Sequence, residues 1–143
     1  MQANKETESA VMSVFDRFRE AYEGRDARAL LSMVAPDPDV VMFGTGADEK
    51  RIGQAEILAQ VERDWAQSEA TSLQIGWHHI SAAGQVAWLA ADVAFEVRAA
   101  DHEMTLPGRL TAVFEQRNSE WLLVQSHFSF PTPGQEEGGS FPT

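Results

Sequence analysis

The order in which two hydrophobic periodicities occur along the chain constrains its fold more than any other feature. In the first half, apolar residues recur at three- and four-residue intervals, which predicts amphipathic helices. Three helices are expected, over about 8–23, 27–34 and 53–68. After residue 70 the helical spacing disappears, and long apolar runs separated by turn residues predict four consecutive antiparallel strands. These strands are expected near residues 73–77, 86–97, 104–116 and 121–130, with an earlier short strand at 40–43.

Helices followed by a run of strands favour an α+β domain, because a sheet with one apolar face needs helices packed against that face. The chain of 143 residues is long enough for one such domain and its own core. We expect a flexible N-terminus over residues 1–7, the folded domain over 8–131 and a flexible tail over 132–143. The tail is dense in Pro, Gly and Glu, a composition that buries too little apolar surface to offset its ordering entropy.

Composition and charge narrow the classes of function. The 22 acidic side chains against 11 basic ones give a formal charge of −11, which disfavours nucleic acid and anionic membranes as partners. No apolar run approaches the roughly 18 residues of a membrane span. The chain has no cysteine, so it forms no disulfide or thiolate metal site, and a cytoplasmic location is expected.

Familiar catalytic and cofactor motifs are not found. No His-x-x-x-His pair, calcium loop, dinucleotide fingerprint, phosphate loop or Gly-x-Ser-x-Gly elbow occurs. We therefore expect neither a dedicated metal site nor a cofactor. The charged run from Asp48 to Arg51 is interpreted as a solvated loop.

Alternation along the strands groups side chains by face. Asp92 shares a face with Trp88, whereas Leu89, Val93 and Phe95 share the other face. The pattern fixes which residues lie together, but it does not say which group meets the helices.

The C-terminal strands carry a family resemblance. Residues 108–117 (GRLTAVFEQR) and 121–129 (WLLVQSHFS) resemble the paired final strands of the SnoaL-like branch of the nuclear transport factor 2-like superfamily, to which ketosteroid isomerases also belong. Two earlier segments also occur in the order found in that branch, Phe43-Gly44-Thr45-Gly46 and Ala87-Trp88, so the resemblance spans about residues 8–131. It implies a cone-shaped barrel with three N-terminal helices packed on a strongly curved, mostly antiparallel sheet. It also implies a cavity beneath the helices and frequent dimerisation through the sheet.

A further similarity, to the association domain of calcium/calmodulin-dependent kinases, orients the strands. Matching that domain places Asp92, Ala112 and Phe128 in the cavity, which makes Asp92 the catalytic candidate as a general base or hydrogen-bond donor. The alternative is that Asp92 pairs with an arginine, a backbone group or water. The expected ligand-binding residues are Tyr22, Trp65, Trp88, Ala112, Ser126 and Phe128. The alternative for any one of the aromatic side chains is plain core, which is the commoner role of aromatic residues at helical spacing.

The same orientation assigns the outer face of the sheet. Arg109, Thr111 and His127 are then expected to form an interface network rather than a catalytic group. Trp121 and Leu123 are expected on the same side, and an apolar row on an exposed sheet face favours a homodimer.

Two functions are consistent with these observations. The first is a small-molecule-binding domain or cofactor-independent enzyme, of isomerase, cyclase or dehydratase type, that acts on a hydrophobic ligand. Ketosteroid isomerisation itself is disfavoured, because the positions matched to that enzyme's tyrosine and aspartate are Phe18 and Phe43-Gly44. The alternative is a non-catalytic dimerisation or partner-binding domain with a closed cavity.

Overall fold

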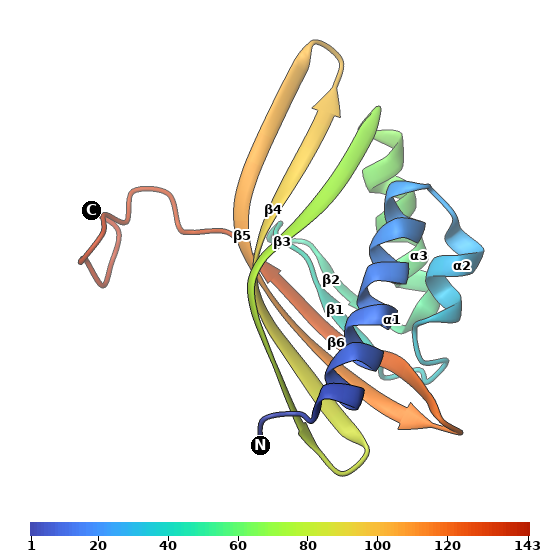
Figure 1. Ribbon diagram of the computed structural model, residues 1–143. Helices are drawn as coiled ribbons and strands as arrows, with labels where there is room; N and C mark the ends of the chain where they lie inside the picture. The colour runs from blue at the N-terminus through green and yellow to red at the C-terminus, as the bar shows by residue number, and fades with distance from the viewer.

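The computed structural model describes residues 1–143 as three helices packed on one six-stranded sheet (Figure 1). The elements in chain order are α1 (Lys5–Glu23), α2 (Ala27–Ser32), β1 (Val41–Phe43), β2 (Lys50–Ile52), α3 (Gly53–Ala66), β3 (Ala70–Ala83), β4 (Val86–Ala99), β5 (His102–Arg117) and β6 (Glu120–Ser129). The α+β prediction is confirmed. None of the helices has the length and apolar character needed to cross a membrane.

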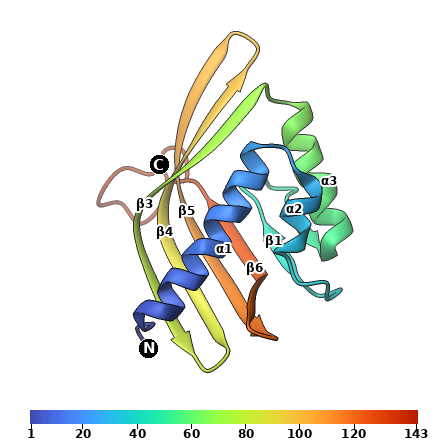
Figure 2. The ribbon, with the colours of Figure 1, turned by 45° about the vertical axis from the view of Figure 1, so that its right-hand side comes forward.

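The sheet is strongly curved, and the helices lie on its concave side (Figures 1 and 2). Its strand order is β2-β1-β6-β5-β4-β3, antiparallel throughout except where β1 runs parallel to β6. The edge strands β2 and β3 do not pair with each other, so the sheet stays open and the expected barrel does not close. Lys50 and Arg51, expected in a loop, belong to the edge strand β2.

Helix α1 begins where its sequence provides a cap. The Asn4 side chain accepts a hydrogen bond from the Thr7 amide at 2.8 Å, which satisfies one of the free donors at a helix start. The face built from Val11, Val14 and Phe18 is buried against the sheet. The residues before α1 also contact the sheet, because the Ala3 amide donates to the Ile80 carbonyl of β3 at 3.1 Å.

An irregularity in β6 changes which of its side chains face the core. Val113 pairs with Gln125 and Phe114 pairs with Leu123, so one extra residue of β6 is inserted between the two pairs. Such a bulge reverses the alternation that follows it. Leu123 and Trp121 therefore belong to the buried core, at 4% and 7% exposure, and the prediction that they lie on the outer face is wrong.

Candidate functional site

A cavity of about 330 Å³ opens between the concave face of the sheet, α1, α3 and the β1–β2 loop. It is lined by 24 residues, of which 13 are hydrophobic. The aromatic part of the lining is well packed. The Phe95 ring lies 5.3 Å from Phe128 and 6.3 Å from Phe130, the second pair edge to face. One side of the cavity is thus a surface suited to an apolar molecule.

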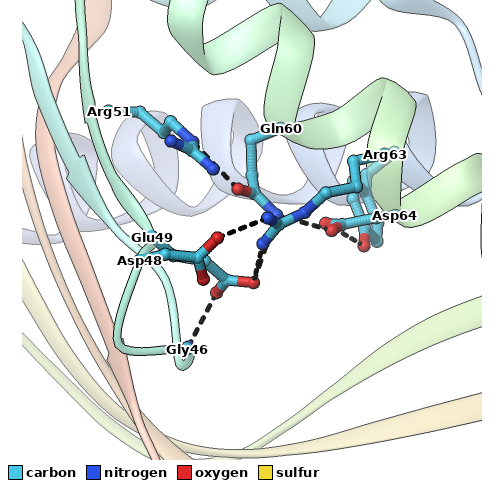
Figure 3. A network of polar contacts seen from close by, with 8 residues as sticks. Gly46, Asp48, Glu49, Arg51, Gln60, Arg63 and Asp64 are labelled. Carbon is cyan, nitrogen blue, oxygen red and sulfur yellow. Dashed lines mark hydrogen bonds and ion pairs between the residues drawn. The ribbon is translucent and has the colours of Figure 1, made fainter.

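The opposite wall is polar and is centred on Asp64 of α3 (Figure 3). The Tyr22 hydroxyl donates to Asp64 Oδ2 at 2.9 Å, and Gln60 Nε2 donates to Asp64 Oδ1 at 2.7 Å. Gln60 is itself held by Arg51, whose Nε donates to Gln60 Oε1 at 2.9 Å. Asp64 therefore has a fixed orientation, set by three other side chains of the cavity wall.

The β1–β2 loop is tied to this wall by ion pairs. Arg63 reaches Asp48 and Glu49, each at 2.7 Å, and Glu49 also accepts from the Gly46 amide at 2.9 Å (Figure 3). The Glu49 side chain is only 17% exposed. The interpretation of residues 48–51 as a solvated loop is therefore wrong for Glu49, because α3 presents an arginine to it.

Burial controls the protonation of the Tyr22–Asp64 pair. Desolvation raises the pKa of Asp64, although the hydrogen bonds from Gln60 and Tyr22 act in the opposite direction. Desolvation and then the nearby Asp64 charge raise the pKa of Tyr22, so the phenol remains a hydrogen-bond donor. A carboxyl group that binds a proton more readily than usual, in contact with a phenol, is chemically able to transfer protons.

The structure separates the predicted ligand-binding residues into two groups. Tyr22, Ser126 and Phe128 line the cavity. Trp65 lies behind Tyr22, with its indole Nε1 donating to the Tyr22 carbonyl at 3.0 Å. Ala112 is part of the core at 2% exposure.

Trp88 lies on the convex face, where it pairs across the sheet with Val113. These two residues are half-buried and outside the cavity lining.

Asp92 does not lie in the cavity, so the prediction that it faces inward is wrong. It is exposed on the convex face and pairs in register with Arg109. The inward positions of β4 are instead Leu89, Ala91 and Val93, all buried. Alternation grouped these residues correctly, but matching to the kinase association domain selected the wrong face of β4.

The prediction that polar residues of the β5–β6 hairpin lie on the outer, convex face of the sheet is confirmed. Arg109, Thr111 and His127 are all exposed, and Thr111 pairs with His127 in register. The His127 ring lies 5.3 Å from the Phe43 ring of β1.

Sequence reasoning missed Asp64 and Gln60. The two residues are four positions apart, so they share a helix face, and that face borders the apolar stripe of Ile57 and Val61. A polar pair at the edge of a buried stripe is a weak signal, because a solvated helix face has the same spacing. Only the position of Tyr22 on α1 shows that this pair lies in a cavity.

Comparison with known proteins gives the family and the fold. A sequence model of the SnoaL-like domain matches residues 11–133. No curated protein matches the chain. A candidate dehydratase of the NTF2-like family from Streptomyces avermitilis superposes with a TM-score of 0.80 at 19% identity, over 87% of this chain and 96% of that one.

Two further structures show the same likeness. An NTF2-like superfamily protein from Salmonella enterica serovar Typhimurium superposes with a TM-score of 0.81 at 16% identity, over 91% of this chain and 94% of the other. A candidate calcium/calmodulin-dependent protein kinase II association domain from Xanthomonas campestris gives 0.76 at 21% identity, over 86% of each chain. At these identities the similarity establishes the fold alone.

Proposed function

The chain belongs to the SnoaL-like domain family, and from that premise we propose that it binds a small, mainly apolar molecule in the cavity beneath its helices. The observation that carries the proposal is the cavity of about 330 Å³, which combines an aromatic surface with one polar wall. A site of this size lies at the lower end of the range for small-molecule pockets. The alternative of a closed cavity filled by side chains does not agree with this volume.

The two walls support different parts of binding. Removing the aromatic surface of Phe95, Phe128 and Phe130 and the apolar surface of the ligand from water lowers the free energy of the complex. The polar wall adds little affinity, because its groups are already paired with one another. It sets the orientation of the ligand in the cavity. We expect the ligand's apolar body to lie on the sheet and a polar group to point toward α3.

If the bound molecule is transformed, Asp64 is the residue that would carry its proton. It replaces Asp92 in the role of acid–base candidate, because Asp64 lines the cavity and Asp92 does not. One structural neighbour is named as a candidate dehydratase, a reaction class that needs proton transfer. No cofactor is part of the proposal, and the cytoplasmic location remains an expectation from the cysteine-free sequence.

The test of binding uses two neighbouring positions of β5 that point to opposite faces. Leu106→Trp fills the cavity, whereas Thr105→Trp places the same side chain on the convex face. We expect apolar ketones and aromatic acids to raise the melting temperature of the wild type and of Thr105→Trp, but not of Leu106→Trp. A ligand at 100 times its Kd should add about 2.7 kcal/mol to the free energy of unfolding.

Two results would count against this function. One is that no member of the ligand panel stabilises the wild type. The other is that Leu106→Trp is stabilised as much as Thr105→Trp, which would place binding outside the cavity.

We also propose that two copies associate through the convex face of the sheet. Three half-buried apolar residues, Trp88, Ala90 and Val113, lie together on this face, and the exposed Thr111 pairs with Ala90 beside them. Light scattering is expected to give twice the mass of one chain. Thr111→Glu should convert the protein to a monomer by burying an unpaired charge, and a monomeric wild type would contradict the proposal.

A further inference from the structure

The loop between β1 and β2, residues 44–49, forms part of the cavity wall but contributes nothing to the apolar core. Gly44 and Glu49 line the cavity. The only apolar side chain of the loop, that of Ala47, is exposed. Within the loop, the Gly44 amide donates to the Glu49 carbonyl at 2.8 Å, and the Glu49 amide donates to the Gly46 carbonyl at 3.0 Å. A segment that buries so little apolar surface opens at a low cost in free energy.

One residue of α3 holds this loop against the polar wall of the cavity. Arg63 bonds to both acidic side chains of the loop, and of these Glu49 is 17% exposed whereas Asp48 is 70% exposed. A charge-assisted hydrogen bond stabilises more where water competes with it less. The Glu49–Arg63 ion pair, which we call the latch, is therefore the stronger of the two attachments.

Two glycines of the loop leave space for the Glu49 carboxylate. Glu49 Oε2 accepts a hydrogen bond from the Gly46 amide at 2.9 Å, so the side chain folds back over its own loop. A Cβ at Gly44 would overlap this carboxylate and would lie 2.9 Å from Glu49 Cβ. A Cβ at Gly46 would lie 3.1 Å from Glu49 Cδ. A side chain at position 44 therefore displaces Glu49 from the latch without removing any charge.

The latch is connected to Asp64 through Gln60 (Figure 3). Gln60 Nε2 donates to Glu49 Oε1 at 3.2 Å and to Asp64 Oδ1 at 2.7 Å. Its Oε1 accepts from Arg51 Nε at 2.9 Å, which turns both amide hydrogens toward the carboxylates. One side-chain amide thus holds two carboxylates next to each other, one on the loop and one on α3.

The charges of this cluster do not balance when every acid is ionised. Its acidic members are three and its basic members two, while Tyr22 of α1 and Thr71 of β3 add no charge. Burial raises the pKa of Asp64, the nearby Glu49 charge adds to that rise, and Arg63 acts against it. A negative charge on Asp64 therefore repels the carboxylate that holds the loop, and a neutral Asp64 removes the excess charge. The charged members are Asp48, Glu49 and Asp64 with Arg51 and Arg63.

We propose that the β1–β2 loop is a gate over the polar wall of the cavity, held closed by the Glu49–Arg63 latch and opened more often when Asp64 is charged than when it is neutral. The coupling is reciprocal, so the closed loop favours the neutral form of Asp64 to the same extent. The inference rests on the proposed function, because it names how the polar wall of the same cavity is regulated.

The experiment observes the loop directly. Because the chain has no cysteine, Ala47→Cys provides a single thiol at an exposed position of the loop for a trifluoromethyl label. Fluorine NMR at pH 8 then measures the ratio of open to closed loop. In the labelled protein, Arg63→Gln should raise this ratio about tenfold. Gly44→Ala should raise it as well, although every charge is retained. Sodium chloride at 1 M should shift the wild-type ratio in the same direction by screening the latch.

The matched control is Arg117→Gln. Arg117 also binds two carboxylates, those of Asp37 and Glu115, and its side chain is 33% exposed against 34% for Arg63. It lies outside the cavity lining, so its loss should leave the loop ratio unchanged. An equal rise in Arg117→Gln, or no rise in either Arg63→Gln or Gly44→Ala, would overturn the gate.

The coupling to Asp64 is tested by a double-mutant cycle. Asp64→Asn should lower the open-to-closed ratio about threefold, since the repulsion between the two carboxylates is removed. The same change in a Glu49→Gln background should have no effect, because no carboxylate is left to repel. An unchanged ratio in Asp64→Asn, or an equal decrease in both backgrounds, would overturn the inference.

Failure of this inference can be told apart from failure of the proposed function. The fluorine measurements contain no ligand, so a loop that never opens leaves binding in the cavity untouched. Absence of any stabilising compound in the ligand panel would remove the proposed function and leave the measured loop equilibrium as it is.

Discussion

The two ends of the β4–β5 hairpin use the same concave face in different ways. Near the start of β4 and the end of β5, the inward side chains are completely packed: Leu89, Leu110 and Phe114 are 0%, 1% and 1% exposed. Toward the turn that joins the strands, inward Val97 is half-buried and Met104 is 45% exposed. One pair of strands is therefore core at one end and cavity wall at the other.

The difference comes from how far the helices reach. Figure 1 shows the tip of the β4–β5 hairpin extending past the helices, while α1 crosses the opposite half of the sheet. The alternation of inward and outward residues continues unchanged along both halves. An apolar residue at an inward position thus becomes core or ligand surface according to the helix above it, and not according to its own type.

The largest expected effect tests this comparison directly. Phe114→Ala should lower the free energy of unfolding by about 3–5 kcal/mol, because it leaves a cavity in packed core. Leu106→Ala, at the other end of the same strand, should cost about 1 kcal/mol or less, since its side chain already borders open space. Urea denaturation measures both changes. Similar costs for the two variants would mean that the cavity end is packed as tightly as the core.

The next effect concerns the boundary between the two regions, where Tyr22 bonds to Asp64. Tyr22→Phe keeps the ring and its packing on Trp65 but removes the hydroxyl, and should cost about 1 kcal/mol. The same change in an Asp64→Asn background should cost less, because its charged acceptor is gone. A double-mutant cycle from denaturation curves measures the difference. Equal costs in both backgrounds would show that the hydroxyl stabilises the protein through some other contact.

The sequence allowed the scaffold to be predicted because periodicity reports secondary structure directly. The helix expected over 53–68 is α3, and the four long strands appear as β3 to β6. Strand β2 escaped prediction because it is three residues long and its charged sequence resembles a turn. The β6 bulge was not predicted for another reason. Trp121 and Leu123 are apolar, so they suit either the core or an apolar outer patch, and only the pairing of Leu123 with Phe114 reveals the inserted residue.

The site was less accessible to sequence reasoning. Tyr22, Ser126 and Phe128 line the cavity, as expected, because their neighbours are apolar and their strands or helix have one clear buried face. Their role in binding a ligand stays a prediction. Asp92 was misplaced because two sets of residues alternate along β4 and the choice between them came from a distant relative. Asp64 was missed because its partner lies 42 residues away on another helix. Local patterns contain no information about that contact.

Carboxylates at the two ends of the molecule also contrast in their pKa values. Burial raises the pKa of Asp64 at the cavity, whereas the hydrogen bond from Arg117 lowers that of Asp37 beside the core end of β5. The raised value means that the folded protein binds the Asp64 proton more tightly than the unfolded chain does. This contribution to stability is complete below the unfolded value of about 3.8 and is lost as pH rises through the folded pKa. For Asp37 the contribution is present above that value and is lost as pH falls through the lowered pKa.

The smallest effect we predict follows from the opposite pKa shifts of Asp64 and Asp37. On acidification from pH 7 toward roughly pH 3, the stability of the wild type relative to Asp64→Asn should rise, while its stability relative to Asp37→Asn should fall. The second change is the weaker, because the Asp37–Arg117 pair is solvent-accessible and screened. Urea denaturation at a series of pH values, with each variant measured beside the wild type, cancels contributions that the proteins share. If the Asp64 difference does not change with pH, Asp64 lies in water and the polar wall of the cavity is open; if it falls on acidification, the hydrogen bonds from Gln60 and Tyr22 outweigh the effect of burial on the pKa of Asp64.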